Sequence, residues 1–246
     1  MRLTNNTILI TGGTSGIGLA LGRSLLGLGN KVVVLGRNEK KLNDVKKEGF
    51  ETICCDLGDI NDINKAVSWI KKTFPNVNML FNNAGIQNNY DFTNSIVDPE
   101  SIVKEINTNL TGQMILTHLL MPLLYNAKKA CIINTTSALG AFAKPDALVY
   151  SATKSAMRNF TRGLRYRLRN SPIRVLELIP PVTDTGMTRG RNGYKMPVEL
   201  FIKKILPRLK KERHVITTPR IRMFLLIAFL APSLAHKILT KGTNKP

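Results

Sequence analysis

The chain has 246 residues, 43% of them hydrophobic, and a formal charge of +20 at pH 7. This length and hydrophobic content are enough to bury a sizeable core, in one large domain or two small ones. Three cysteines (Cys54, Cys55 and Cys131) lack metal-ligand spacing, which favours a reduced, cytoplasmic protein without a metal. Residues 1–6 are polar and the first apolar run, 8–10, is short, so no signal peptide is expected.

The positive charge is concentrated in the second part of the chain. Residues up to Tyr150 include 15 basic and 12 acidic side chains, whereas those from Ser151 onward include 21 basic and 4 acidic. Such an excess favours contact with anions, which could be a phosphorylated ligand, an anionic membrane surface or nucleic acid. A solvated basic face explains the charge equally well, and no specific nucleic-acid partner is expected.

Short apolar runs alternate with helical patterns along the whole chain. The runs suit buried parallel strands and occupy residues 7–11, 31–36, 51–55, 77–82, 130–136, 173–179 and 214–218. Helices are predicted over 16–28, 39–48, 60–74, about 99–126, 149–170 and 198–211, the first closed by Gly29. The alternation predicts a single α/β domain over residues 1–246, a doubly wound parallel sheet of about seven strands with helices on both faces.

The first predicted strand runs into TGGTSGIG, residues 11–18, and then into a helix. In this context Gly12 permits a tight turn, Gly16 a close approach to a pyrophosphate, and Gly18 close packing of helix on strand. The helix N-terminus offers free N–H groups to the phosphates. The spacing Gly-x-x-x-Gly-x-Gly differs from the usual fingerprint, but the context predicts nucleotide binding.

The residues after the second predicted strand bear on the choice of cofactor. An acid usually stands there and binds the ribose 2′-OH, but this chain has Gly36, Arg37 and Asn38. A guanidinium can bind a 2′-phosphate through two hydrogen bonds, whereas a carboxylate would repel it. Arg37 therefore favours NADP(H) over NAD(H), unless it only caps a loop.

Seven motifs together resemble the short-chain dehydrogenases/reductases. They are TGGTSGIG at 11–18, CCDL at 54–57, NNAG at 82–85, NTNLTG at 107–112, Ser137 in TTSALG, YSATK at 150–154 and PPVTDTGM at 180–187. Their order and spacing are those of the family, and they span most of the chain. The resemblance implies a Rossmann-type oxidoreductase that moves hydride between a nicotinamide cofactor and a carbonyl or alcohol substrate.

The resemblance also implies a catalytic set of four residues. Tyr150 would exchange the proton, and Lys154, one helical turn away, would lower the phenol pKa from its usual value of about 10 and bind the nicotinamide ribose. Ser137 would polarise the substrate oxygen. Asn109 would hold a water that joins Lys154 to solvent.

The cofactor contacts implied by the resemblance are spread along the chain. They are Gly12, Thr14, Ser15, Gly16, Ile17, Gly18, Arg37, Asp56, Leu57, Asn83, Ala84, Gly85, Tyr150, Lys154, Pro180, Val182 and Thr185. Two positions depart from the family. Pro180-Pro181 stands where Pro-Gly is common, which removes an N–H donor. Ser15 stands where NADP-preferring members often carry a basic residue, which leaves Arg37 as the main 2′-phosphate candidate.

A substrate-side loop is expected at 183–198. Its stretch TRGRNGYKMP carries Arg189, Arg191 and Lys195 without an acid. This composition fits an acidic or phosphorylated substrate or an acyl carrier partner, and it fits a mobile, solvated lid at least as well.

Two further features concern partners. Arg158, Arg162, Arg165 and Arg169 form a stripe on a helix that, in the resembled family, helps to build a homodimer or homotetramer. The stripe could meet acidic partners, sit at the rim of the interface or face solvent. Within a C-terminal apolar segment at 220–240, the uncharged run 223–235 is too short to span a membrane, at roughly 20 Å. It could pack in the core or an oligomer, or insert shallowly as a peripheral membrane contact.

A rival reading is a non-catalytic nucleotide-sensing or binding protein that uses its basic C-terminal third to contact membrane or nucleic acid. The intact set of Asn109, Ser137, Tyr150 and Lys154 argues against it, because a sensor needs no proton relay. Neither reading identifies the substrate. With NADPH in a reducing cytoplasm, reduction is the favoured direction.

Overall fold

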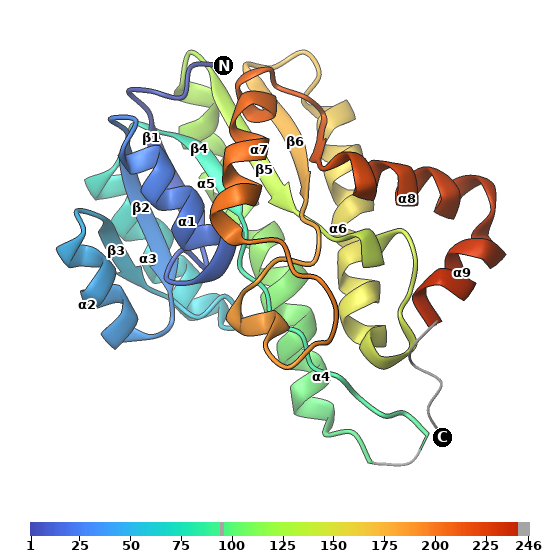
Figure 1. Cartoon of the computed structure of the whole chain (residues 1–246). Helices are drawn as coiled ribbons and strands as arrows, with labels where there is room; N and C mark the ends of the chain where they lie inside the picture. The colour runs from blue at the N-terminus through green and yellow to red at the C-terminus, as the bar shows by residue number, and fades with distance from the viewer. Residues whose placement is uncertain (94–95, 241–246) are drawn as a thin grey trace.

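Seven parallel strands form one sheet in the computed structural model, which describes residues 1–93 and 96–240 (Figure 1). The order across the sheet is β3-β2-β1-β4-β5-β6-β7. The strands are β1 (Thr7–Thr11), β2 (Lys31–Gly36), β3 (Glu51–Cys54), β4 (Val77–Asn82), β5 (Ala130–Thr135), β6 (Ile173–Ile179) and β7 (Val215–Thr217). The strand order reverses between β1 and β4, which opens a crevice at the carboxyl edge of the sheet.

Helices cover both faces of the sheet. α1 (Gly16–Leu26), α2 (Glu39–Lys47) and α7 (Val198–Lys210) pack on one face, and α3 (Ile60–Thr73), α5 (Gly112–Asn126) and α6 (Leu148–Arg167) on the other. Side chains of β1 alternate between the layers: Ile8 and Ile10 join the core under α1 and α7, and Leu9 joins the core under α3 and α5. The prediction of a single, doubly wound Rossmann-type domain is confirmed.

One predicted helix is interrupted near the carboxyl edge of the sheet. The pattern over 99–126 contains α4 (Pro99–Ile106), a π-helical turn η1 (Asn107–Thr111) and then α5. A π turn keeps the chain helical while it adds one residue to the turn, so helix-forming composition alone does not reveal it. The predicted end of the first helix is also shifted, because α1 ends at Leu26 with Gly27 as its C-cap.

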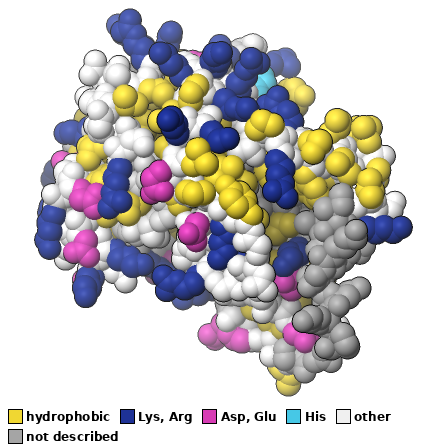
Figure 2. Space-filling view, in the orientation of Figure 1, with side chains coloured by type: hydrophobic (Ala, Val, Ile, Leu, Met, Phe, Trp, Pro, Cys, Tyr) yellow, Lys and Arg dark blue, Asp and Glu magenta, His cyan; other side chains and the backbone are white. Residues whose placement is uncertain are grey.

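The C-terminal part forms two helices, α8 (Pro219–Leu230) and α9 (Pro232–Thr240), which lie at the side of the molecule beyond α6 (Figure 1). α8 contains no buried residue, and Phe229 and Leu230 are 82% and 68% exposed. Figure 2 shows hydrophobic side chains gathered on this face. The possibility that 223–235 packs in the core of this chain is therefore wrong for α8. None of the helices in the described ranges is long and apolar enough to cross a membrane.

Candidate active site

The loop between β1 and α1 has a backbone that requires glycine. Gly12 and Gly16 have φ angles of +66° and +53°. A Cβ atom on Gly12 would lie 2.8 Å from the Cα of Ala84, and one on Gly18 would lie 2.5 Å from the carbonyl oxygen of Gly12. The Ser15 hydroxyl makes no capping hydrogen bond at the N-terminus of α1. The first N–H groups of α1 are therefore left for a ligand, and the loop fits a pyrophosphate.

A threonine that sequence analysis missed joins this loop to the segment after β4. The Thr11 hydroxyl accepts hydrogen bonds from the backbone N–H groups of Asn83 (2.9 Å) and Ala84 (3.0 Å). The Asn83 side chain donates to the Thr11 carbonyl at 3.2 Å. Asn83, Ala84 and Gly85 are thereby brought beside the glycine loop, as predicted. The sequence signal that could have identified Thr11 is a hydroxyl at the carboxyl end of a buried strand, because the carboxyl ends of parallel strands lie along one edge of the sheet.

Arg37 and Asp56 lie together at the ends of β2 and β3. The Arg37 Nη1 atom is 3.8 Å from Asp56 Oδ2, and the arginine side chain is half exposed. Thr14 lies close by, since a Cβ on Gly36 would be 3.0 Å from its methyl group. The two predicted cofactor residues thus share one corner of the crevice, whereas Leu57 is buried in the core below. Sequence analysis did not anticipate their pairing.

The remaining predicted cofactor positions divide between the loop and its surroundings. Thr185 approaches the glycine loop, because a Cβ on Gly16 would lie 3.1 Å from its methyl group. Val182 is half exposed and Pro180 is half-buried just after β6. Ile17 packs against the core under α1. The structure therefore brings Thr185 to the loop and leaves Val182 and Pro180 along the edge of the crevice.

Tyr150 and Lys154 are both buried near the start of α6. Ser137, two residues after β5, lies near enough to the Tyr150 phenol to affect its pKa. Burial raises the pKa of Tyr150 to about 12, and the interaction with Ser137 and the charge of Arg191 act in the opposite direction. The Lys154 ammonium lies 5.6 Å from the centroid of the tyrosine ring and donates to the Thr135 carbonyl at 3.0 Å. Burial lowers the pKa of Lys154 to about 8.

Asn109 lies in the π turn, where its side chain is held at both ends. Its Oδ1 accepts from the Ile86 N–H and its Nδ2 donates to the Ile86 carbonyl, each at 2.8 Å. A Cβ on Gly85 would lie 3.4 Å from Asn109 Oδ1 and 3.6 Å from Lys154 Nζ. Because Gly85 has no side chain, there is room between the Asn109 amide and the Lys154 ammonium. All four predicted catalytic residues meet at one edge of the sheet.

Glu105 is a buried carboxylate that sequence analysis missed. It lies in α4 four residues before Asn109 and is fully buried. Its Oε2 accepts the Asn88 N–H at 3.3 Å, while Oε1 has no hydrogen-bond partner among the described residues. Burial raises the pKa of Glu105, and its negative charge raises the pKa of both Lys154 and Tyr150. The i, i+4 spacing to Asn109 was the signal that could have identified it.

The arginine stripe on α6 is split between the core and solvent. Arg158 Nε lies 2.9 Å from Oε1 of the buried Glu177, and Arg165 donates to the carbonyls of Val175 and His214. Arg162 and Arg169 are exposed. At about 100° per residue Arg158, Arg162 and Arg165 span an arc of about 60°, which crosses the boundary between the sheet side and the solvent side of the helix. Arg169 lies beyond the end of α6 at Arg167, so the predicted stripe does not extend to it along the helix. Half of the stripe is therefore structural.

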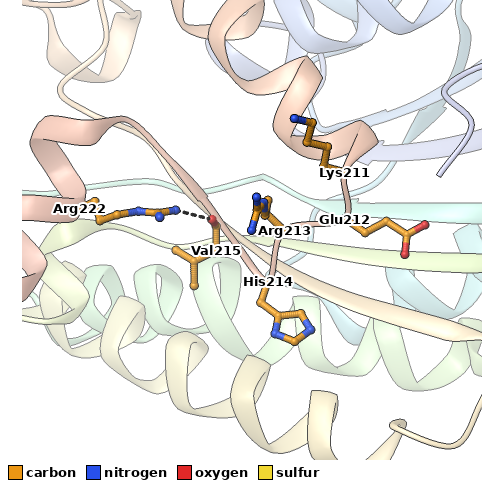
Figure 3. Close-up of a pocket in the computed structure, with 6 residues that line it drawn as sticks. All are labelled: Lys211, Glu212, Arg213, His214, Val215 and Arg222. Carbon is orange, nitrogen blue, oxygen red and sulfur yellow. Dashed lines mark hydrogen bonds between the residues drawn. The ribbon is translucent and has the colours of Figure 1, made fainter.

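A cavity of about 590 Å³ lies beside the amino end of β7 (Figure 3). It is lined by Lys211, Glu212, Arg213, His214, Val215 and Arg222. Arg222 donates to the Val215 carbonyl at 3.5 Å, while Glu212 points away and pairs with the N-terminal amine at 2.8 Å. Because His214 precedes β7, this cavity opens at the edge opposite the glycine loop.

Comparisons with known proteins agree with this geometry. The short chain dehydrogenase family matches residues 6–194. An uncharacterized oxidoreductase, DltE, of Bacillus subtilis is 37% identical over 90% of this chain and 91% of its own length. Serine 3-dehydrogenase of Agrobacterium fabrum is 32% identical, over 77% and 76%. A short chain dehydrogenase from Burkholderia cenocepacia, solved in complex with NADP, superimposes with a TM-score of 0.86 at 24% identity over the whole of both chains. The chain therefore belongs to the short-chain dehydrogenase family and is an oxidoreductase of the type that uses a nicotinamide cofactor.

Proposed function

We propose that this protein interconverts a carbonyl and an alcohol with NADP(H), with Tyr150 as the proton donor and acceptor. The observation that carries the proposal is the convergence of Tyr150, Ser137, Lys154 and Asn109 beside a glycine loop that fits a pyrophosphate. The bound cofactor would supply or accept the hydride. A buried phenol with a high pKa remains protonated at neutral pH and can donate to a developing alkoxide.

Ser137 and Lys154 have separate roles in this proposal. Ser137 interacts with the phenol and would hold the substrate oxygen next to it. The Lys154 ammonium faces the ring from 5.6 Å, from where its charge would stabilise a phenolate. In this structure its hydrogen bond goes to Thr135, so the predicted bond to a ribose would be formed in addition or in exchange.

Asn109 would complete a path for the proton. Its amide is fixed by Ile86, and the space left by Gly85 separates it from Lys154. A water in this space could join the lysine to the solvent side. That predicted role remains a proposal supported by the position of the amide.

The preference for NADP(H) rests on Arg37. Its guanidinium is half exposed and is paired over 3.8 Å with a partly exposed carboxylate, so it can turn to a phosphate at little cost. The Burkholderia structure of the same fold was solved with NADP. Arg37→Glu should weaken NADPH binding at least about tenfold and leave NADH binding within about threefold, measured by fluorescence titration. An unchanged preference for NADPH would remove Arg37 from the assignment.

Turnover tests the catalytic proposal and its rival together. Wild type and Tyr150→Phe are compared with NADPH and a panel of aldehydes and ketones, followed at 340 nm. We expect the variant to bind NADPH normally and to lose about 100-fold or more in rate. Equal rates in both proteins would refute the mechanism, and NADPH binding without turnover of any carbonyl would favour the non-catalytic nucleotide-binding protein.

The predictions about partners and location are not tested by the fold. A homodimer or homotetramer, a cytoplasmic location and a peripheral membrane contact all stay predictions. The membrane contact is supported by the exposed apolar side chains of α8 and by the cations Arg220, Arg222 and Lys237 near them. Light scattering of the purified protein and flotation with anionic vesicles would test these two forms of association.

A further inference from the structure

A cavity of about 580 Å³ lies between the segment after β4 and the loop after β6. Its lining combines side-chain amides, hydroxyls and two guanidinium groups: Gln87, Asn88, Asn89, Tyr90, Ser101, Met187, Arg189, Gly190 and Arg191. None of these lining residues is acidic. The cavity therefore offers hydrogen-bond donors and positive charge without an opposing carboxylate on its wall.

Arg191 is the fixed cation of this cavity. It is half-buried, and its Nη2 donates to Gln87 Oε1 at 2.6 Å across 104 residues of sequence. The loop that carries it is closed at its neck by backbone hydrogen bonds from Asp184 to Met196 and from Met196 to Val182, both 2.9 Å. Within residues 1–93 and 96–240, no carboxylate lies at ion-pair distance from Arg191. Its positive charge is thus held in place without an anion from the described part of the chain.

Two of the residues that line the cavity link it to the neighbourhood of the proposed proton donor. Gln87 directly follows Ile86, whose backbone is held by the Asn109 side chain. From the other side, the charge of Arg191 reaches Tyr150 and opposes the rise of its pKa. Glu105 supports the wall through the Asn88 N–H but is buried behind it, so it does not fill the cavity. A molecule whose carbonyl faces Tyr150 would extend from there towards Arg191.

We propose that this cavity binds the carboxylate of a small oxo or hydroxy acid, with Arg191 as the residue that recognises it. A guanidinium matches a carboxylate through two parallel hydrogen bonds, and the neighbouring amides can supply further donors. Arg189 is exposed at the mouth of the cavity and acts as a weaker, solvent-screened second cation. One half-buried guanidinium with uncharged amides, beside a solvent-screened second cation, balances the single charge of a carboxylate better than the double charge of a phosphate. This inference rests on the proposed carbonyl–alcohol activity of the same site.

The test uses paired substrates that differ chiefly in charge. Short hydroxy acids with the hydroxyl on carbon 2, 3 or 4 are compared with their methyl esters and with phosphate esters of similar length, as NADP⁺ reduction at 340 nm. The quantity measured is the ratio of kcat/KM for an acid to kcat/KM for its ester, in wild type, Arg191→Gln, Arg191→Lys and Arg189→Gln. The ratio cancels any general effect of Arg191 on Tyr150, and thermal unfolding confirms that each variant is folded.

Wild type should prefer one acid over its ester, and Arg191→Gln should reduce that ratio about 10- to 100-fold, mainly through KM for the acid. Arg191→Lys should retain part of the preference, and Arg189→Gln should change the ratio less than about threefold. An unchanged ratio in Arg191→Gln, with turnover that still depends on Tyr150, overturns the inference but leaves the proposed function standing. A preference for the phosphate esters overturns the choice of carboxylate.

Direct binding separates a failure of this inference from a failure of the proposed function. If no hydroxy acid is oxidised, isothermal titration of butanoate or hexanoate into the protein saturated with NADPH replaces turnover. Binding by wild type that is lost in Arg191→Gln supports the carboxylate site. Equal binding by the two proteins, or none by wild type, overturns it.

Discussion

Two regions of this molecule reverse the usual distribution of polar and apolar side chains, and they do so in opposite ways. At the carboxyl edge of the sheet, Glu105, Asn109 and Lys154 are buried, whereas in α8 Phe229 and Leu230 are exposed. The buried groups are held mostly by hydrogen bonds from the chain itself. No part of the described chain covers the outer face of α8. The polar groups of the first region are held mainly by contacts within one chain, whereas the apolar side chains of the second face its surroundings.

The largest expected effect tests how strongly buried charge depends on its partner. Arg158→Met removes the guanidinium that lies 2.9 Å from Glu177, which is 1% exposed. A buried carboxylate without its cation should lower the free energy of unfolding by about 3–5 kcal/mol, measured by urea denaturation. Arg162→Met, an exposed site on the same helix, is the matched control and should change it by less than about 0.5 kcal/mol. Equal effects would mean that the arginine stripe acts as one unit.

The second prediction concerns the pH dependence of the proposed reaction at the carboxyl edge of the sheet. The negative charge of Glu105 raises the pKa of Lys154, which is about 8, and that of Tyr150, which is about 12. Carbonyl reduction needs both groups protonated, so its rate should fall as the pH rises through the lower value. Glu105→Gln should lower both pKa values and move this basic limb of the kcat/KM profile to lower pH. Glu100→Gln, exposed in the same helix, should not move it, and a limb unchanged in both variants would show that Glu105 is only structural.

The smallest expected effect tests the other region. Because the Phe229 side chain is already 82% exposed, Phe229→Ser should change the free energy of unfolding by less than about 0.5 kcal/mol. Leu116→Ala, in the core under α5, should cost about 2–5 kcal/mol in the same urea titration. A large loss in Phe229→Ser at low protein concentration would show that α8 contributes to the folded chain itself. A loss that grows with protein concentration would indicate that self-association covers this face.

The fold and the location of the site were predictable because both depend on local pattern and on strand direction. Short apolar runs mark buried strands, and the ends of parallel strands meet at one edge. This pattern predicted the place of the glycine loop, whereas the grouping of Asn83, Ser137 and Tyr150 with it came from the resemblance of their motifs to the short-chain dehydrogenase family. The fold of the chain confirms that the elements carrying them converge there.

Other features depend on how each helix is rotated about its axis and on how deeply its side chains are buried. The spacing of residues in the sequence does not determine either. The arginine stripe is one face by spacing, but it straddles a burial boundary that only the packing of α6 on β6 defines. Glu105 has the composition of a surface helix residue, and its burial follows from the position of α4 beneath residues 88–90. The exposure of α8 was also not predictable, because an apolar run has the same sequence pattern whether it packs in the core or lies on the surface.

The π turn at Asn107–Thr111 has a consequence for how the chain tolerates insertion and deletion. An extra residue in one helical turn lets α4 and α5 meet with a phase that a regular helix would not allow. Removing any one residue of this turn would restore a regular helix and rotate one side by about 100° relative to the other. Asn109 and Glu105 would then no longer face Ile86 and Asn88 together. In this turn the number of residues, independently of their identity, determines where the Asn109 and Glu105 side chains lie.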